Sequence, residues 1–263
     1  MIIEVPYFKY INQYKLFKMQ NRKILEKYDI DLKVYDGLGN SPWNGGRFPN
    51  HDLPKKGINV SFAITAHTIN DFNHKESHKI LKDYDVPGNS IVISNLELLE
   101  KLKTIYKNYI YIYSITAFDI NQGFDKYQNI EQLVDYIVPR SELIDNIEEF
   151  YKLNTEQYIL LYSYECSYCP LYTEHYKYIG ENINDQSKAH LTKCWFKNKK
   201  LFNELKYNVD DYDYEYTSSA KFHHKLTDID SNVIGGYKIG RNFQDFDKIK
   251  DELWEIIKTI EKY

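Results

Sequence analysis

Short apolar runs recur along this chain, and most of them are followed by a polar loop and then by a helical pattern. The clearest runs cover residues 32–35, 58–65, 89–94, 109–114, 136–139, 158–162 and 234–241, with a weaker candidate at 214–222. Continuous apolar runs bounded by polar residues are typical of buried parallel strands. Their alternation with helical patterns predicts a parallel sheet whose strands are connected by helices.

The number of these units and the chain length together indicate the architecture. Seven or eight strands in 263 residues favour a (β/α)8 TIM-like barrel, formed by a single domain over residues 1–263, rather than an open doubly wound sheet. No G-x-G-x-x-G sequence follows the first predicted strand, which argues against a dinucleotide-binding fold. The class expected is therefore α/β with parallel strands.

Helices are predicted at both ends of the chain and between the strands. The N-terminal segment 1–28 carries a helix over 8–28, and an amphipathic helix covers 244–263. Further helices are expected over 73–83, 96–103, about 130–134 and 142–150. Asn95 and Ser141 are the predicted N-caps of the second and fourth of these, because their side chains can accept a hydrogen bond from the first helical turn.

Composition excludes some classes of protein. The net charge is −4, so the chain lacks a strong nucleic-acid signature, although this does not exclude an RNA substrate bound in a local groove. No apolar run approaches the roughly 20 residues that a membrane span needs. The first residues do not resemble a signal peptide, so a cytoplasmic protein is expected. The sequence does not indicate an oligomeric state.

Polar residues follow several of the predicted strands. In a barrel the loops after the strands share one face, which is where active sites lie. Arginine can bind a carboxylate or phosphate through two hydrogen bonds, and asparagine offers both a donor and an acceptor. The predicted substrate-binding residues are Asp36, Asn44, Arg47, His67, Asn95, Lys238 and Arg241. The alternatives are an ordered loop with a surface arginine at 36–47 and a purely structural histidine at 67; no catalytic residue is singled out.

A cysteine-rich stretch follows the run at 158–162, which is the sixth predicted strand. Cys166 and Cys169 form a C-x-x-C pair, and Cys194 follows 25 residues later. Three thiolates with His175 or His190 would complete a tetrahedral zinc site. An iron–sulfur cluster usually has four cysteines, so here it would need another kind of fourth ligand or an open iron. Metal binding of either kind is predicted; the alternative is that these are ordinary cysteines.

Three segments resemble peptidase U32-like proteins. Residues 225–241 are similar to the end of that family, where a polar "S-x-x-D-L" segment precedes a "K-I-E-G-R" strand end; the chain has Lys238-Ile239-Gly240-Arg241 there. The strand at 90–95 with its leucine-rich helix and the position of the cysteine loop are also similar. The family's four-cysteine pattern is incomplete, since no cysteine lies near 231–232, which indicates a divergent, viral or accessory member.

The resemblance implies a TIM-like barrel with an iron–sulfur cluster in many members. Those members include collagenase-like peptidases and proteins for oxygen-independent hydroxylation of RNA or of ubiquinone precursors. We therefore expect a metal- or iron–sulfur-binding enzyme that modifies, by hydroxylation, an RNA base or a small molecule. The alternatives are a U32-type peptidase, or a non-catalytic barrel with a structural zinc that binds a partner.

Overall fold

The chain forms an eight-stranded parallel α/β barrel in the computed structural model, which describes residues 1–45, 52–54, 57–118, 124–163, 175, 177–178, 229–241 and 245–263. The strands are β1 (Ile2–Pro6), β2 (Asp31–Asp36), β3 (Asn59–Ile64), β4 (Ser90–Ile93), β5 (Ile110–Tyr113), β6 (Tyr136–Ile137), β7 (Ile159–Ser163) and β8 (Gly236–Ile239). The described helices of at least four residues are α1 (Ile11–Gln20), α2 (Arg22–Lys27), α3 (Lys75–Asp83), α4 (Leu96–Ile105), α5 (Phe124–Glu131), α6 (Ser141–Asp145), α7 (Ile147–Phe150) and α11 (Phe246–Lys262).

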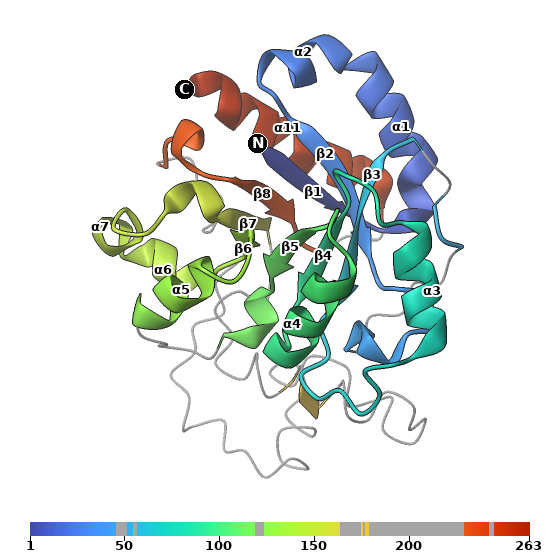
Figure 1. Cartoon of the computed structure of the whole chain (residues 1–263). Coiled ribbons are helices and arrows are strands. Elements are labelled where there is room, and N and C mark those ends of the chain that lie inside the picture. The colour runs from blue at the N-terminus through green and yellow to red at the C-terminus, as the bar shows by residue number, and fades with distance from the viewer. Residues whose placement is uncertain are drawn as a thin grey trace, which may run out of the picture.

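The strands follow one another around the barrel in the order β6-β5-β4-β3-β2-β1-β8-β7, and every pair is parallel. A single parallel bridge between Ile137 and Tyr158 joins the two ends of this sheet, so the barrel is nearly closed. Figure 1 shows the helices on the outside of the strands. The predicted parallel α/β barrel is confirmed at this level.

One hydrophobic core fills the space between strands and helices. The prediction for the C-terminal helix is confirmed: Ile249, Leu253 and Ile256 of α11 are at most 1% exposed. This helix packs against α1 through two edge-to-face aromatic pairs, Tyr14–Phe246 at 5.2 Å and Phe17–Trp254 at 5.4 Å between ring centroids. The two ends of the chain are thereby joined on one side of the barrel.

The first strand was not predicted. Residues 2–6 form β1, which lies between β2 and β8. The strand before the cysteine loop is therefore the seventh, not the sixth. The charged Glu4 and the terminal Pro6 interrupt the apolar pattern, and this is why the sequence signal was weak. The weaker strand candidate at 214–222 lies outside the described residues.

Several helices also differ from their predicted limits. The N-terminal helix is interrupted at Asn21, which lies between α1 and α2. The helix expected near 130–134 is α5, which begins at Phe124 and ends at Glu131. The helix expected over 142–150 is divided at Asn146, whose side chain accepts a hydrogen bond from Glu149 N at the start of α7. Ser141 is the first residue of α6, with Arg140 at the N-cap position. Asn95 caps α4 as predicted.

Candidate active site

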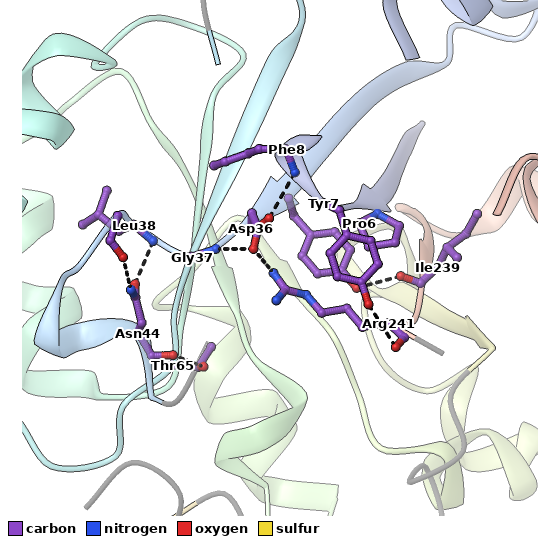
Figure 2. Close-up of polar contacts among 12 residues, drawn as sticks. Pro6, Tyr7, Phe8, Asp36, Gly37, Leu38, Asn44, Thr65, Ile239 and Arg241 are labelled. Atoms are coloured by element: carbon purple, nitrogen blue, oxygen red, sulfur yellow. Dashed lines mark hydrogen bonds and ion pairs between the residues drawn. The ribbon is translucent and has the colours of Figure 1, made fainter. Parts of the chain in front are cut away.

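Asp36 and Arg241 meet at the carboxyl ends of β2 and β8. The Arg241 Nη2 donates to Asp36 Oδ1 at 2.6 Å, and the two side chains are 19% and 3% exposed. Asp36 also accepts from the backbone N–H groups of Gly37 (2.9 Å) and Phe8 (3.0 Å), as Figure 2 shows. One buried carboxylate thus connects the ends of three strands. Two of the predicted site residues are brought into direct contact.

Two tyrosines surround the Arg241 guanidinium. Its central carbon lies 5.3 Å from the ring centroid of Tyr7 and 5.2 Å from that of Tyr35, within the range of cation–π attraction. The Tyr7 hydroxyl donates to Arg241 O at 3.2 Å, and the Tyr35 hydroxyl donates to Ile239 O at 2.8 Å. Together with Asp36, these contacts define the Arg241 cage, which consists of Tyr7, Tyr35, Asp36 and Arg241. Tyr7, Asp36 and Arg241 are labelled in Figure 2.

Lys238 lies inside the barrel, next to the Arg241 cage. It forms a buried ion pair with Glu4, and the side chains are 5% and 0% exposed. Its Nζ also lies 3.8 Å from the ring centroid of Tyr35. Lys238 was predicted as a substrate contact, and the structure shows that its charge is balanced by Glu4 within the barrel.

A second lysine fills the inner face of β2. Lys33 is fully buried, and its Nζ donates to Ser90 Oγ of β4 at 2.7 Å and lies 3.6 Å from Asp31 Oδ2. Burial lowers the pKa of Lys33, because the charged form loses its hydration, while Asp31 and Glu4 oppose that shift. Glu4, Tyr7 and Lys33 are not among the site residues that the sequence predicts. For Glu4 and Lys33, the available signal is a charged residue within an apolar run.

The loop after β2 uses Asn44 as an internal support. The Asn44 amide accepts from Leu38 N at 2.7 Å and donates to Gly39 O at 2.7 Å, and the residue is 1% exposed. Gly45 adopts φ +57°, and a Cβ there would lie 2.5 Å from the backbone of Thr65. These contacts fit a structural role for Asn44 in holding the loop to β3. Arg47, the other predicted anchor of this loop, lies outside the described residues.

His67 and Asn95 lie at the ends of β3 and β4. The Asn95 amide donates to His67 O at 2.8 Å, and its oxygen accepts from Leu98 N at 2.8 Å. Next to them, Thr116 Oγ1 lies 2.5 Å from Ser94 Oγ and 3.0 Å from Ser114 Oγ, and all three residues are buried. The polar contacts described in this part of the barrel end are made by hydroxyls and amides.

The predicted metal ligands Cys166, Cys169, Cys194 and His190 lie outside the described residues. His175 is described, and it is partly buried. Within the described ranges no group of three or more histidine, cysteine, aspartate or glutamate side chains is arranged to hold a metal ion. The metal prediction therefore stays a prediction. In the same part of the chain, no helix is both long and apolar enough to cross a membrane.

No family model matches the chain, and no solved structure matches it. The chain is similar to the lysine biosynthesis regulatory protein LYS14 of Saccharomyces cerevisiae, with 26% identity over 284 residues that include 88% of this chain. The match spans only 35% of that regulator's length. A likeness of this extent does not place the chain in a family.

Proposed function

We propose that this protein is a barrel enzyme of the peptidase U32-like kind, with a TIM-like fold and an active site at the carboxyl ends of β1, β2 and β8. In this proposal it modifies a small molecule or an RNA base, by hydroxylation, and Arg241 contacts an anionic group of the substrate. The observation that carries the proposal is the Asp36–Arg241 pair, which lies where barrel enzymes keep their active sites.

The cost of that arrangement supports a functional role. A buried ion pair contributes little net stability, because desolvation of both charges offsets their attraction. The Arg241 cage nevertheless places a cation where the strands end, held by a carboxylate and two aromatic rings. A binding site for an anion needs such a cation. For the stability of the fold alone, an apolar side chain at position 241 would be equally suitable.

The residues behind the family resemblance also support the proposal. Lys238 and Arg241 belong to the segment that resembles the U32-like strand end, and each forms an ion pair with a different strand, β1 for Lys238 and β2 for Arg241. This segment therefore organises one side of the barrel end. The resemblance and the geometry concern the same residues, although they are independent observations.

The metal centre of the proposed enzyme would be held by Cys166, Cys169 and Cys194. Three thiolates with one histidine suit zinc, and an iron–sulfur cluster would retain one iron without a cysteine. A cluster would supply electron transfer for hydroxylation, and zinc would supply either a Lewis acid or a purely structural support. His175 and His190 are the candidate fourth ligands. A zinc-supported barrel that only binds a partner is the second candidate, because this donor set suits structural zinc.

Anaerobic purification followed by metal and sulfide analysis tests the proposal. Iron and sulfide in nearly equal amounts, lost in Cys166→Ala and Cys194→Ala, would support the hydroxylation enzyme. Zinc alone, with no turnover, would favour the non-catalytic barrel, and peptide hydrolysis that chelators do not affect would favour the peptidase. Absence of any metal in a folded wild-type protein would contradict the metal centre. Arg22→Ala, a change at an exposed residue, is a control that should retain full metal content.

A further inference from the structure

A cavity lies at the end of the barrel opposite the Arg241 cage. It has a volume of about 640 Å³ and is bounded by α1, by the first residues of β3 and by the chain from the end of α3 to β4. Asn59 and Asn89 line it, at the amino ends of β3 and β4. Cavities of this size hold small organic molecules. Because barrel enzymes keep their active sites at the carboxyl ends of the strands, a ligand in this cavity would not be the substrate of the proposed reaction.

One wall of the cavity is apolar and fixed in position. Ile58 and Val60 contribute buried apolar side chains, which are 9% and 2% exposed. The Tyr84 hydroxyl donates to Pro54 O at 2.6 Å, and the Tyr84 ring contacts the Phe62 ring edge to face at 5.3 Å between centroids. These contacts form the wall before any ligand binds, and the wall suits an apolar group.

The cavity also carries two opposite charges that do not meet. Lys18 of α1 is partly buried, and its ammonium has no hydrogen bond or ion pair with any other residue that the structure describes. Asp83, the last residue of α3, is exposed, and within the described ranges its carboxylate has no such partner either. The neighbouring Arg22 and Glu26, in contrast, form an ion pair at 2.6 Å. Two helices therefore present one cation and one carboxylate to the same cavity, and a ligand can contact both.

We propose that this cavity binds a small zwitterion of the amino-acid type, with its carboxylate at Lys18, its ammonium at Asp83 and a large apolar side chain against Tyr84 and Val86. The inference goes beyond the proposed function, because it concerns the opposite end of the barrel. Each charged group of such a ligand would form a charge-assisted hydrogen bond with the group of opposite charge. A ligand with only one charge would leave the other group of the cavity without a partner. Val86 is 46% exposed, so an apolar side chain that covers it removes apolar surface from water.

L-Phenylalanine is the probe, and three related compounds each lack one of its groups. Phenylalanine amide lacks the carboxylate, N-acetyl-phenylalanine lacks the ammonium, and L-alanine lacks the large side chain. Binding is measured by NMR titration of 15N-labelled protein at about pH 6, where α-amino groups are protonated. The backbone amide signals of Asn59 and Val86 report on the cavity. We expect saturable shifts with phenylalanine, affinities roughly fivefold lower for the loss of either charge, and a still lower affinity for alanine.

Two substitutions connect each charge of the ligand with its partner. Lys18→Met should lower the affinity for phenylalanine roughly fivefold and make phenylalanine and its amide bind equally well. Asp83→Asn should in the same way remove most of the difference between phenylalanine and its N-acetyl derivative. Neither side chain forms a hydrogen bond among the described residues, so both variants should fold. Lys79→Met is the matched control, because the exposed Lys79 of α3 does not line the cavity, and it should bind all the compounds as the wild type does.

Three results would contradict the inference. Absence of a saturable shift of the Asn59 and Val86 signals with phenylalanine would overturn it entirely. Binding of the N-acetyl derivative at least as tight as that of phenylalanine would show an anion site instead of a zwitterion site. A difference between phenylalanine and its amide that persists in Lys18→Met would overturn the contact at Lys18. None of these results bears on the Asp36–Arg241 pair, which lies at the other end of the barrel.

Discussion

Two groups of buried polar side chains lie in different parts of the barrel, and we call these parts the charged side and the hydroxyl side. On the charged side, β8, β1 and β2 carry the pairs Lys238–Glu4 and Arg241–Asp36, whose partners are 234 and 205 residues apart in the sequence. On the hydroxyl side, Thr116 contacts Ser94 and Ser114, which are only 22 and 2 residues away. A hydroxyl can donate or accept a hydrogen bond, and as a neutral group it costs less to bury than a charge. A buried charge, in contrast, needs a partner of opposite charge to offset its lost hydration.

This difference indicates where in the barrel a functional site is expected. A charged interior is an expensive way to fill a barrel, because TIM-type interiors are usually packed with branched apolar residues. The ion pairs Lys238–Glu4 and Arg241–Asp36 both lie on the strands that carry the Arg241 cage. We therefore expect the charged side to be sensitive to single substitutions and the hydroxyl side to be more tolerant. This contrast can be measured as the change in the free energy of unfolding of single variants, by chemical denaturation.

The largest effect is expected at the Lys238–Glu4 pair. Glu4→Ala leaves the Lys238 ammonium buried without its carboxylate partner and should cost about 3–5 kcal/mol. The double variant Glu4→Met/Lys238→Met should recover most of this loss, because a buried pair can be replaced by apolar residues of similar volume. Costs that simply add in the double variant would show that the two residues act independently.

A slightly smaller effect is expected at Asp36. Asp36→Asn removes the charge that Arg241 contacts and replaces one acceptor oxygen by an NH2 donor, facing either Phe8 N or Arg241. The expected cost is about 2–3 kcal/mol, since hydrogen bonds to charged groups contribute more than neutral ones. Asp71→Asn is a matched control, because the exposed Asp71 carboxylate accepts from the nearby backbone N–H of Asn73, and the substitution should change stability by less than about 0.5 kcal/mol. Equal costs at the two positions would contradict the special role of Asp36.

On the hydroxyl side, Thr116→Val should cost about 1–2 kcal/mol. The substitution keeps the shape but removes the hydroxyl that Ser94 and Ser114 share, and neutral hydrogen bonds contribute about this much. The exposed Thr104 of α4 offers the control substitution Thr104→Val, which should have almost no effect. A Thr116→Val cost as large as that of Glu4→Ala would remove the contrast between the two sides.

The smallest effect is expected at Ser61, on the inner face of β3. Its hydroxyl is buried and has no hydrogen-bond partner among the described residues. Ser61→Ala should therefore change stability by less than about 0.5 kcal/mol, in either direction. A cost above roughly 1.5 kcal/mol would indicate a bound water or another partner at this hydroxyl.

The sequence predicted the architecture better than it predicted the site. Buried parallel strands such as 90–93 are continuous apolar runs and could be recognised from the sequence. β1 could not be recognised, because the charged Glu4 interrupts its apolar run. The partner that balances this charge, Lys238, lies 234 residues away in the sequence. Asp36 and Arg241 could be predicted as one site because parallel strands end at the same face. Their pairing could not, since the register of β8 beside β1 depends on tertiary packing. Asn44 was predicted as a substrate contact because its amide can both donate and accept. In the structure this amide forms hydrogen bonds with Leu38 and Gly39 of its own loop.

The mobility of the Arg241 side chain tests most directly whether the Arg241 cage holds the guanidinium in place. Asp36, Tyr7 and Tyr35 contact the guanidinium and should fix it before any ligand binds. Nuclear relaxation of the four arginine Nε–H groups should therefore give Arg241 an order parameter near 0.8, close to that of a rigid backbone, and give the exposed Arg22 one below about 0.6. An Arg241 side chain as mobile as that of Arg22 would show that the Arg241 cage does not fix the guanidinium.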